Sequence, residues 1–379
     1  MTAAIGRLRV PVPAASTVPV FVVLTVLLVS LAFVGPAYDE PSGYIALLKR
    51  AAPLIILAVG QYFVIVSGGF DLSVGSLVTA EVVVAARLLD GRDELTWPVI
   101  ALLLLGGAFV GLVNGLISTV LAVPSFITTL GMLLVLEGAV FLWTGGAPRG
   151  ALTEGFRMLG REGIDDVPGI GLLPYSVLVL VAIVALAAWL MRTGTGRTLL
   201  AVGDNDAAVL LAGGRVRTLR TGAFVLSGLM ASVAAILLGG FSGVSAQVGA
   251  GLEFEAITAV VLGGVVLGGG RGSVVAAAAG ALTLQALFSL MNLLGVSGAL
   301  ESTVQGLIII AAVAYASASA RFAGRFRRTA RHPAPPGTDA PPTGPTTPAP
   351  STAAPTQAAA DTTTTVGEPS GPPLEKEHR

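Results

Sequence analysis

The chain has 379 residues, of which 54% are hydrophobic and 12% are charged, whereas an average soluble domain has roughly 25% charged residues. The formal net charge is zero, and the absence of cysteine excludes disulfides, thiolate metal sites and cysteine nucleophiles. The two histidines, His332 and His378, lie in a polar C-terminal region, which excludes a histidine-based metal site or proton relay inside a membrane. So large an apolar excess indicates a chain whose surface is covered by lipid.

The apolar residues cluster into stretches close to the roughly 20 residues that a membrane-spanning helix needs. Runs such as VLVLVAIVALAAWL are continuously apolar rather than alternating, which favours helices over a β-barrel. We therefore predict an all-α integral membrane protein with about ten transmembrane helices. The first stretch is longer than the usual signal-peptide core, so we expect an uncleaved span there rather than a signal peptide. The predicted spans are 18–34, 51–66, 74–88, 99–121, 126–143, 172–190, 219–241, 256–267, 273–294 and 300–314.

Basic residues are distributed unevenly between the predicted loops. An even number of spans with both termini on one side places thirteen arginines near the spans on that side and seven Lys or Arg residues on the other. Because Lys and Arg concentrate in cytoplasmic loops, we expect both termini in the cytoplasm. The chain then divides into a cytoplasmic segment 1–17, a transmembrane domain 18–317 and a cytoplasmic tail 318–379. The tail is rich in Pro, Thr and Ala, and we predict that it is disordered because it has too few apolar residues to form a core.

The segment SGGFDLSVGS, residues 67–76, joins the second and third spans. Its paired glycines would interrupt a helix, and it places Asp71 among apolar residues. A carboxylate near the bilayer interior is costly unless it faces a cavity or a partner, and non-helical backbone there needs hydrogen bonds from protein or water. Asp71 could instead cap the third helix, as Asp commonly does just before an apolar helical run. Both interpretations of Asp71 stay open.

A similar order of features occurs in the second half of the chain. Glu253 and Glu255 follow glycines before a short apolar stretch, and Asn292 ends a span as Asn114 does in the first half. An offset of five spans predicts an inverted pseudo-repeat, which many transporters use to build a site at the repeat interface. We predict pathway or gate positions at Asp71, Ser73, Asn114, Glu253 and Asn292. For two further carboxylates, Glu81 and Glu137, we expect an interhelical hydrogen bond or a position near the end of a span.

The loop 192–220 contains a short predicted helix. Asn205 is a suitable N-cap, Asp206 favours the positive end of a helix, residues 207–212 favour helix, and Gly213 would end it. Such an amphipathic helix either lies on the membrane surface or docks into a groove of a partner.

These motifs resemble those of one transporter family. The loop carries a GR, AxGxN and Ala-rich pattern that is similar to the coupling-helix loop of permeases from the ribose-type branch of the ABC importer family, a branch shared with xylose, nucleoside and branched-chain amino acid permeases. SGGFDLSVGS, VPSFITTLGM with its following TGG, the stretch ending in GGRGS, and NLLGVS resemble further motifs of that family in unbroken order over residues 51–314. Phe70, Asp204 and Leu210 depart from the family pattern.

The resemblance implies a type II-like ABC importer permease in the bacterial plasma membrane. ATP-binding subunits would grip the loop, an extracytoplasmic binding protein would deliver the solute, and a second permease copy, identical or paralogous, would complete the pathway. The loop residues that the resemblance assigns to coupling are Arg197, Gly203, Asn205, Ala208 and Gly213. The sequence has no GxxxxGK[ST] phosphate-binding loop, so ATP hydrolysis is expected in a separate chain. We expect no cofactor, metal or nucleic acid.

The resemblance favours a monosaccharide, a pentose or hexose, as the solute. Nucleosides, a furanosyl signal molecule and branched-chain amino acids are alternatives on the same scaffold. A secondary carrier or channel that needs no ATPase is a second alternative, and a membrane enzyme is a third, although no paired acid and base or metal cluster is visible.

Overall fold

The computed structural model describes residues 17–311 of the chain, apart from 297, 299, 302 and 309. Residues 1–16, the predicted tail 318–379 and the end of the tenth predicted span lie outside the described residues.

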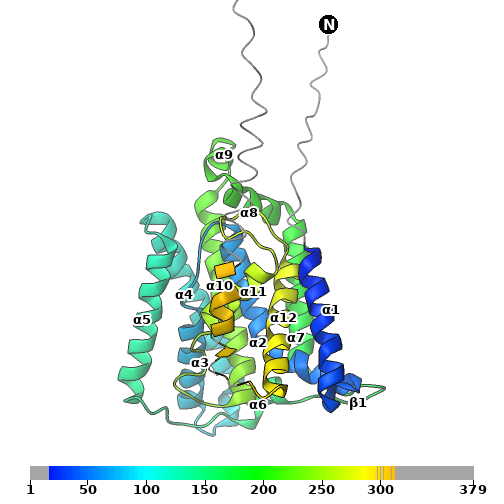
Figure 1. Ribbon diagram of the computed structural model, residues 1–379. Helices are drawn as coiled ribbons and strands as arrows, with labels where there is room; N and C mark the ends of the chain where they lie inside the picture. The colour runs from blue at the N-terminus through cyan, green and yellow to red at the C-terminus, as the bar shows by residue number, and fades with distance from the viewer. Residues whose placement is uncertain (1–16, 297, 299, 302, 309, 312–379) are drawn as a thin grey trace, which may run out of the picture. The chain divides into compact units, whose positions relative to one another are not determined.

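Helices make up most of the described structure, as Figure 1 shows. The helices are α1 Val18–Val34, α2 Pro41–Val66, α3 Val74–Leu89, α4 Thr96–Val120, α5 Ser125–Thr144, α6 Glu154–Arg161, α7 Tyr175–Arg192, α8 Gly194–Asp204, α9 Asp206–Leu211, α10 Val216–Ser242, α11 Leu252–Leu262 and α12 Val274–Leu293, with short 3-10 turns η1 Pro36–Tyr38 and η2 Asp93–Leu95. One antiparallel hairpin, β1 Gly163–Val167 with β2 Gly171–Pro174, precedes α7.

The predicted all-α membrane class is confirmed. Nine of the ten predicted spans overlap α1–α5, α7 and α10–α12, and the described part of the tenth is helical. Among the described helices, six are long and apolar enough to cross a membrane, namely α2, α4, α5, α7, α10 and α12. Helix length alone therefore does not establish the predicted count of ten.

Helices α2 and α10 form the centre of the bundle. The stretch 51–66 of α2 is buried on every side, and α10 packs along both α2 and α4. Small residues allow this close approach: a Cβ atom on Gly107 of α4 or on Gly228 of α10 would overlap the other helix. The core is therefore a helix-on-helix contact made by glycine, as is common within membranes.

Two interruptions break the helical pattern inside the bundle. Residues 67–73 run without helix between α2 and α3, and residues 243–251 do so between α10 and α11. The second interruption packs against the first turns of α3, because the N–H of Gly249 donates to Thr79 Oγ1 over 3.0 Å and Gly249 contacts Gly75.

The eighth predicted span, 256–267, is wrong in its bounds. Its helix α11 begins at Leu252 and ends at Leu262. Four glycines with positive φ, at positions 264, 269, 270 and 272, then turn the chain back toward the end of α2, where the N–H of Gly270 donates to the carbonyl of Val66 over 2.9 Å. Helix α7 likewise begins only at Tyr175, because the start of the predicted span 172–190 lies in β2.

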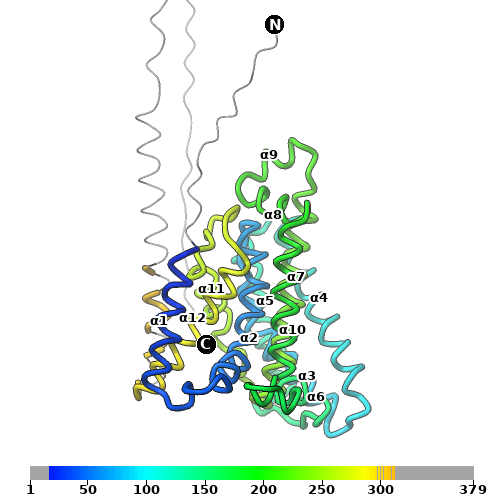
Figure 2. Tube along the Cα trace, turned by 90° about the vertical axis from the view of Figure 1, so that its right-hand side faces the viewer, coloured from blue at the N-terminus to red at the C-terminus, as the bar shows by residue number. Residues whose placement is uncertain are grey.

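The two ends of the bundle differ. Helices α8 and α9 lie at one end, and α6 with the β-hairpin lies at the other (Figures 1 and 2). Helix α5 stands at the edge with most of its surface uncovered, while α1 packs against α12 through Val20, Ala276 and Ala279.

Candidate functional site

The non-helical segment 67–73 is held by a buried polar cluster around Asp71. Asp71 Oδ1 accepts hydrogen bonds from the backbone N–H of Ser73 over 3.0 Å and from its hydroxyl over 2.6 Å, and Oδ2 accepts from the Ser227 hydroxyl over 2.8 Å. The side-chain amide of Gln61, in the orientation that satisfies its polar atoms, donates to the carbonyl of Asp71 and accepts from its N–H over 3.1 and 3.2 Å. The backbone groups that leave the helix therefore find partners within the bundle.

Asn114 of α4 extends this cluster. Its Nδ2 donates to the Ser73 hydroxyl over 2.9 Å, whereas its Oδ1 has no partner within the described structure. The side chains of Asp71, Ser73 and Asn114 are at most 1% exposed. The structure thus brings together three residues that the sequence predicted, but in this conformation they offer almost no surface to a solute.

Two members of the cluster were missed by sequence reasoning. Gln61 is the single amide within the apolar run 51–66, and that isolation could have marked it. Ser227 of α10 carried no signal, because Ser is ordinary in spanning helices.

The start of α5 is tied to the same segment. The N–H of Phe70 donates to the Ser125 hydroxyl over 3.1 Å, and its carbonyl accepts from the Thr129 hydroxyl over 3.3 Å. A cavity of about 560 Å³ opens beside these contacts toward α9, with Gly69, Ser125 and Arg220 among its lining residues. Segment 67–73 therefore forms one wall of a cavity on the α9 side.

Glu253 and Asn292 occupy different places. Glu253 is buried in the first turn of α11 and packs against Gly75, close to the start of α3. Asn292 is exposed in the last turn of α12, where the neighbouring Leu293 contacts Gly35, and no hydrogen bond joins it to the cluster among the described residues.

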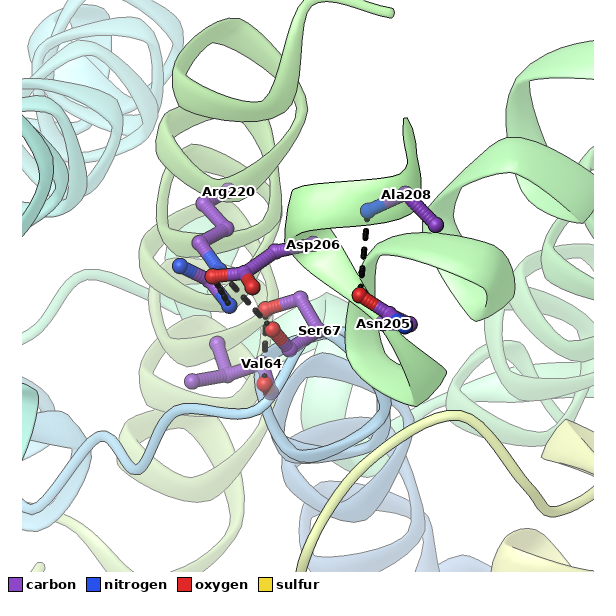
Figure 3. Close-up of polar contacts among 6 residues, drawn as sticks. All are labelled: Val64, Ser67, Asn205, Asp206, Ala208 and Arg220. Atoms are coloured by element: carbon purple, nitrogen blue, oxygen red, sulfur yellow. Dashed lines mark hydrogen bonds and ion pairs between the residues drawn. The ribbon is translucent and has the colours of Figure 1, made fainter. Parts of the chain in front are cut away.

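The predicted short helix in the loop 192–220 is confirmed as α9. Asn205 is its N-cap and accepts a 3.0 Å hydrogen bond from the N–H of Ala208 through Oδ1 (Figure 3). Gly213, with φ of +80°, follows the C-cap as the predicted stop. The structure adds α8, an eleven-residue helix immediately before α9 that the sequence analysis did not predict.

A junction joins this loop to the end of α2. Arg220 of α10 donates from Nε to the carbonyl of Ser67 over 3.0 Å, and its Nη2 lies 3.1 Å from Oδ2 of Asp206 in α9 (Figure 3). Gly203 of α8 lies directly against the carbonyl of Val66 and the amide of Gly270, with no room for a side chain. The loop, the end of α2 and the turn after α11 therefore meet at one place.

The outer surface of α9 has no cover within the described part of the chain. Leu210 is 66% and Leu211 is 90% exposed, and Arg197, Ala208 and Gly213 are also exposed. Adjacent exposed leucines on a capped and anchored helix are typical of a surface that binds another protein. No group of three His, Cys, Asp or Glu side chains within the described ranges could hold a metal ion.

Comparison with known proteins identifies the family. The family model described as "Branched-chain amino acid transport system / permease component" matches residues 43–313. The ribose import permease RbsC of Escherichia coli strain K12 is 37% identical over 296 residues, which cover 77% of this chain and 91% of that protein. The RbsC protein of Bacillus subtilis strain 168 is 36% identical over 299 residues, covering 77% of this chain and 90% of the relative.

A further relative is named for a different solute. The autoinducer 2 import system permease LsrC of Escherichia coli strain K12 / DH10B is 34% identical over 269 residues, covering 70% of this chain and 77% of that protein. No solved structure matches the chain significantly.

The family match contains all of the polar cluster and the whole α8–α9 loop, and the relatives are permease subunits of import systems. The chain is therefore a multi-pass plasma-membrane transport subunit rather than an enzyme. It belongs to the branched-chain amino acid transport system permease family, in the ribose-type branch of the ABC importers.

Proposed function

We propose that the chain is one permease half of an ATP-driven importer for a monosaccharide. Two copies, or this chain and a paralogue, would form the pathway, and a separate ATP-binding subunit would bind α9 from the cytoplasm. An extracytoplasmic binding protein would deliver the sugar at the opposite end, beside α6. Both termini would then lie in the cytoplasm, in agreement with the distribution of arginines.

The observation that carries the proposal is the exposed and anchored α9. Asn205 fixes the start of this helix, and Leu210 and Leu211 offer an apolar surface to a partner. Arg220 connects α9 with the carbonyl of Ser67, the first residue of the interruption that holds Asp71. A displacement of α9 by an ATP-binding subunit would therefore act on segment 67–73 and switch the pathway between its two open states.

The remaining predicted residues take roles in this scheme. Asp71, Ser73 and Asn114 would form the gate, and their side chains would change hydrogen-bond partners when the pathway switches. Glu253 would line the pathway. Arg197, Ala208 and Gly213 would belong, with Asn205, to the surface that binds the ATP-binding subunit, and Gly203 would take part in coupling by holding the loop against the end of α2. Asn292 would act near the outer end of α12, away from the gate.

The relatives' names favour one class of solute without defining a single compound. Relatives named for ribose and autoinducer 2 support a sugar or a furanosyl signal molecule, and nucleosides or branched-chain amino acids are the alternatives. An ATP-independent carrier is the alternative mechanism. It would function without any ATP-binding subunit, whereas an ABC permease should co-purify with one.

Substitutions in α9 test the coupling role. Asn205→Pro removes the cap, and Ala208→Asp places a charge on the exposed surface; both should separate ATP hydrolysis from uptake in proteoliposomes containing the complete transporter. Ala37→Asp, on the exposed turn η1, is the matched control and should leave uptake intact. Normal uptake in both α9 variants, or uptake by the permease without an ATP-binding subunit, would contradict the proposal.

A further inference from the structure

A second cavity, of about 730 Å³, lies between α3, α5 and the segment 246–253. We call it the acidic cavity. Its polar and aromatic lining includes Ser76, Thr79, Glu137, Phe141, Gln247 and Glu253. It is separate from the cavity beside α9, because the two share no lining residue.

The walls of the acidic cavity are fixed by backbone contacts. Thr79 Oγ1 accepts the N–H of Gly249, and Gly249 packs against Gly75 at the start of α3. Glu253 fills the space over Gly75 and is only 7% exposed, so its position on this wall is determined by packing. Glu137, by contrast, is exposed on α5 and lines the same cavity from the opposite element.

The charge of the cavity has one sign. Among the described residues that line it, two are carboxylates and none is Lys, Arg or His. Neither carboxylate forms an ion pair within the described part of the chain, where the ion pairs are Arg220 with Asp206 and Arg271 with Asp204. The field inside the cavity therefore repels anions, and low-dielectric walls strengthen that repulsion.

The hydrogen-bonding groups define which solute fits. Ionised carboxylates only accept hydrogen bonds, the Gln247 amide both donates and accepts, and the hydroxyls of Ser76 and Thr79 do the same. Phe141 adds an apolar surface. This combination suits a small uncharged solute that carries several hydroxyl donors, and it disfavours a carboxylate or phosphate, for which the lining has no basic partner.

We propose that the acidic cavity is a solute-selective site of the permease itself. In it, Glu137 and Glu253 accept hydrogen bonds from the hydroxyl groups of an uncharged, hydroxyl-rich solute, and their charge excludes anions. The proposal rests on the proposed transport function and deepens it. It places a specificity filter in the membrane subunit, and it favours sugars over amino acids and phosphorylated compounds.

The cysteine-free sequence allows a direct test. Ala250→Cys introduces one thiol into the cavity, and Ala37→Cys introduces one on the exposed turn η1 as a control. The complete transporter in nanodiscs, with both membrane faces accessible, is treated with a cationic and an anionic methanethiosulfonate reagent of similar size. The ratio of the cationic to the anionic rate should be at least about tenfold higher at position 250 than at position 37, since a charged cleft concentrates opposite charge by such factors.

Neutralisation and protection complete the test. Glu137→Gln combined with Glu253→Gln should reduce the ratio at position 250 to that of the control, while Glu162→Gln, outside the cavity, should not change it. D-ribose in large excess should slow modification at position 250 more than L-leucine or ribose 5-phosphate does. Equal ratios at the two positions, or better protection by ribose 5-phosphate or L-leucine than by ribose, would overturn the proposal.

ATP hydrolysis, measured on the same nanodiscs, distinguishes a failure of the cavity proposal from a failure of the proposed importer function. Equal ratios in a complex whose ATPase responds to the loaded binding protein would refute the cavity assignment alone. A permease with no ATP-binding partner would refute the importer function, whatever the reagents show.

Discussion

The guanidinium of Arg220 lies 3.1 Å from the carboxylate of Asp206, the first residue of α9. The same guanidinium donates to the carbonyl of Ser67 at the end of α2. The two side chains are 32% and 53% exposed, and ion pairs of that kind contribute less than about 1 kcal/mol to stability. The contact is therefore better explained as a mechanical connection than as a source of stability.

Arg220→Lys tests that connection. Lysine keeps the charge but lacks the planar fork that reaches two partners at once. The free energy of unfolding should change by less than about 1 kcal/mol, while the number of solute molecules imported per ATP falls. Thermal unfolding of the complex and coupled uptake and ATPase assays measure the two effects, with the exposed Arg215→Lys as control. Unchanged coupling in Arg220→Ala would contradict the interpretation.

Gly203→Ala should destabilise the junction. A Cβ atom at position 203 would overlap the carbonyl of Val66 and the amide of Gly270, which are backbone groups that cannot move aside easily. Overpacking of this kind costs about 1–3 kcal/mol. Gly222→Ala is the matched control, because no atom lies within 4 Å of a Cβ added there. Equal thermal stability of the two variants would show that the junction is looser than the structure indicates.

The sequence predicted the features that depend on local chemistry. Apolar length located the helices, and the Asn205 cap with the Gly213 stop located α9 to within one residue at each end. The motif around Asp71 correctly marked an interruption between two helices. These predictions succeeded because capping residues, glycines and apolar runs act over a few neighbouring residues.

Features that depend on distant partners were not predictable in the same way. Gln61 and Ser227 contact Asp71 only because α2 and α10 pack around the interruption, and nothing near Ser227 in sequence indicates that contact. The end of α11 was misplaced because its following residues, through Leu267, are still largely apolar, although glycine conformations end the helix at Leu262. The acidic cavity joins Glu137 to Glu253, which are far apart in the chain.

Asp71→Asn should weaken the buried cluster. The carboxylate accepts three hydrogen bonds from Ser73 and Ser227, whereas an amide has to direct its NH2 group toward one of those donors. An unsatisfied buried donor costs about 1–3 kcal/mol, which should appear as a lower thermal stability of the purified permease. Asp90→Asn, at an exposed position with φ of +40°, should change stability by about 0.5 kcal/mol or less. Equal effects at the two positions would indicate that the cluster does not stabilise the fold.

Thr79→Val should loosen the segment 243–251, which forms one wall of the acidic cavity. Valine has the shape of threonine but cannot accept the hydrogen bond from the N–H of Gly249, so a buried backbone donor loses its partner at a cost of about 1–3 kcal/mol. Faster hydrogen exchange at the Gly249 amide would report this loss directly. Thr283→Val is the matched control, because among the described residues the buried Thr283 hydroxyl bonds only to the Ala279 carbonyl of its own helix. Unchanged exchange at Gly249 in Thr79→Val would mean that glycine packing against Gly75, rather than the hydroxyl, holds the segment 243–251 against α3.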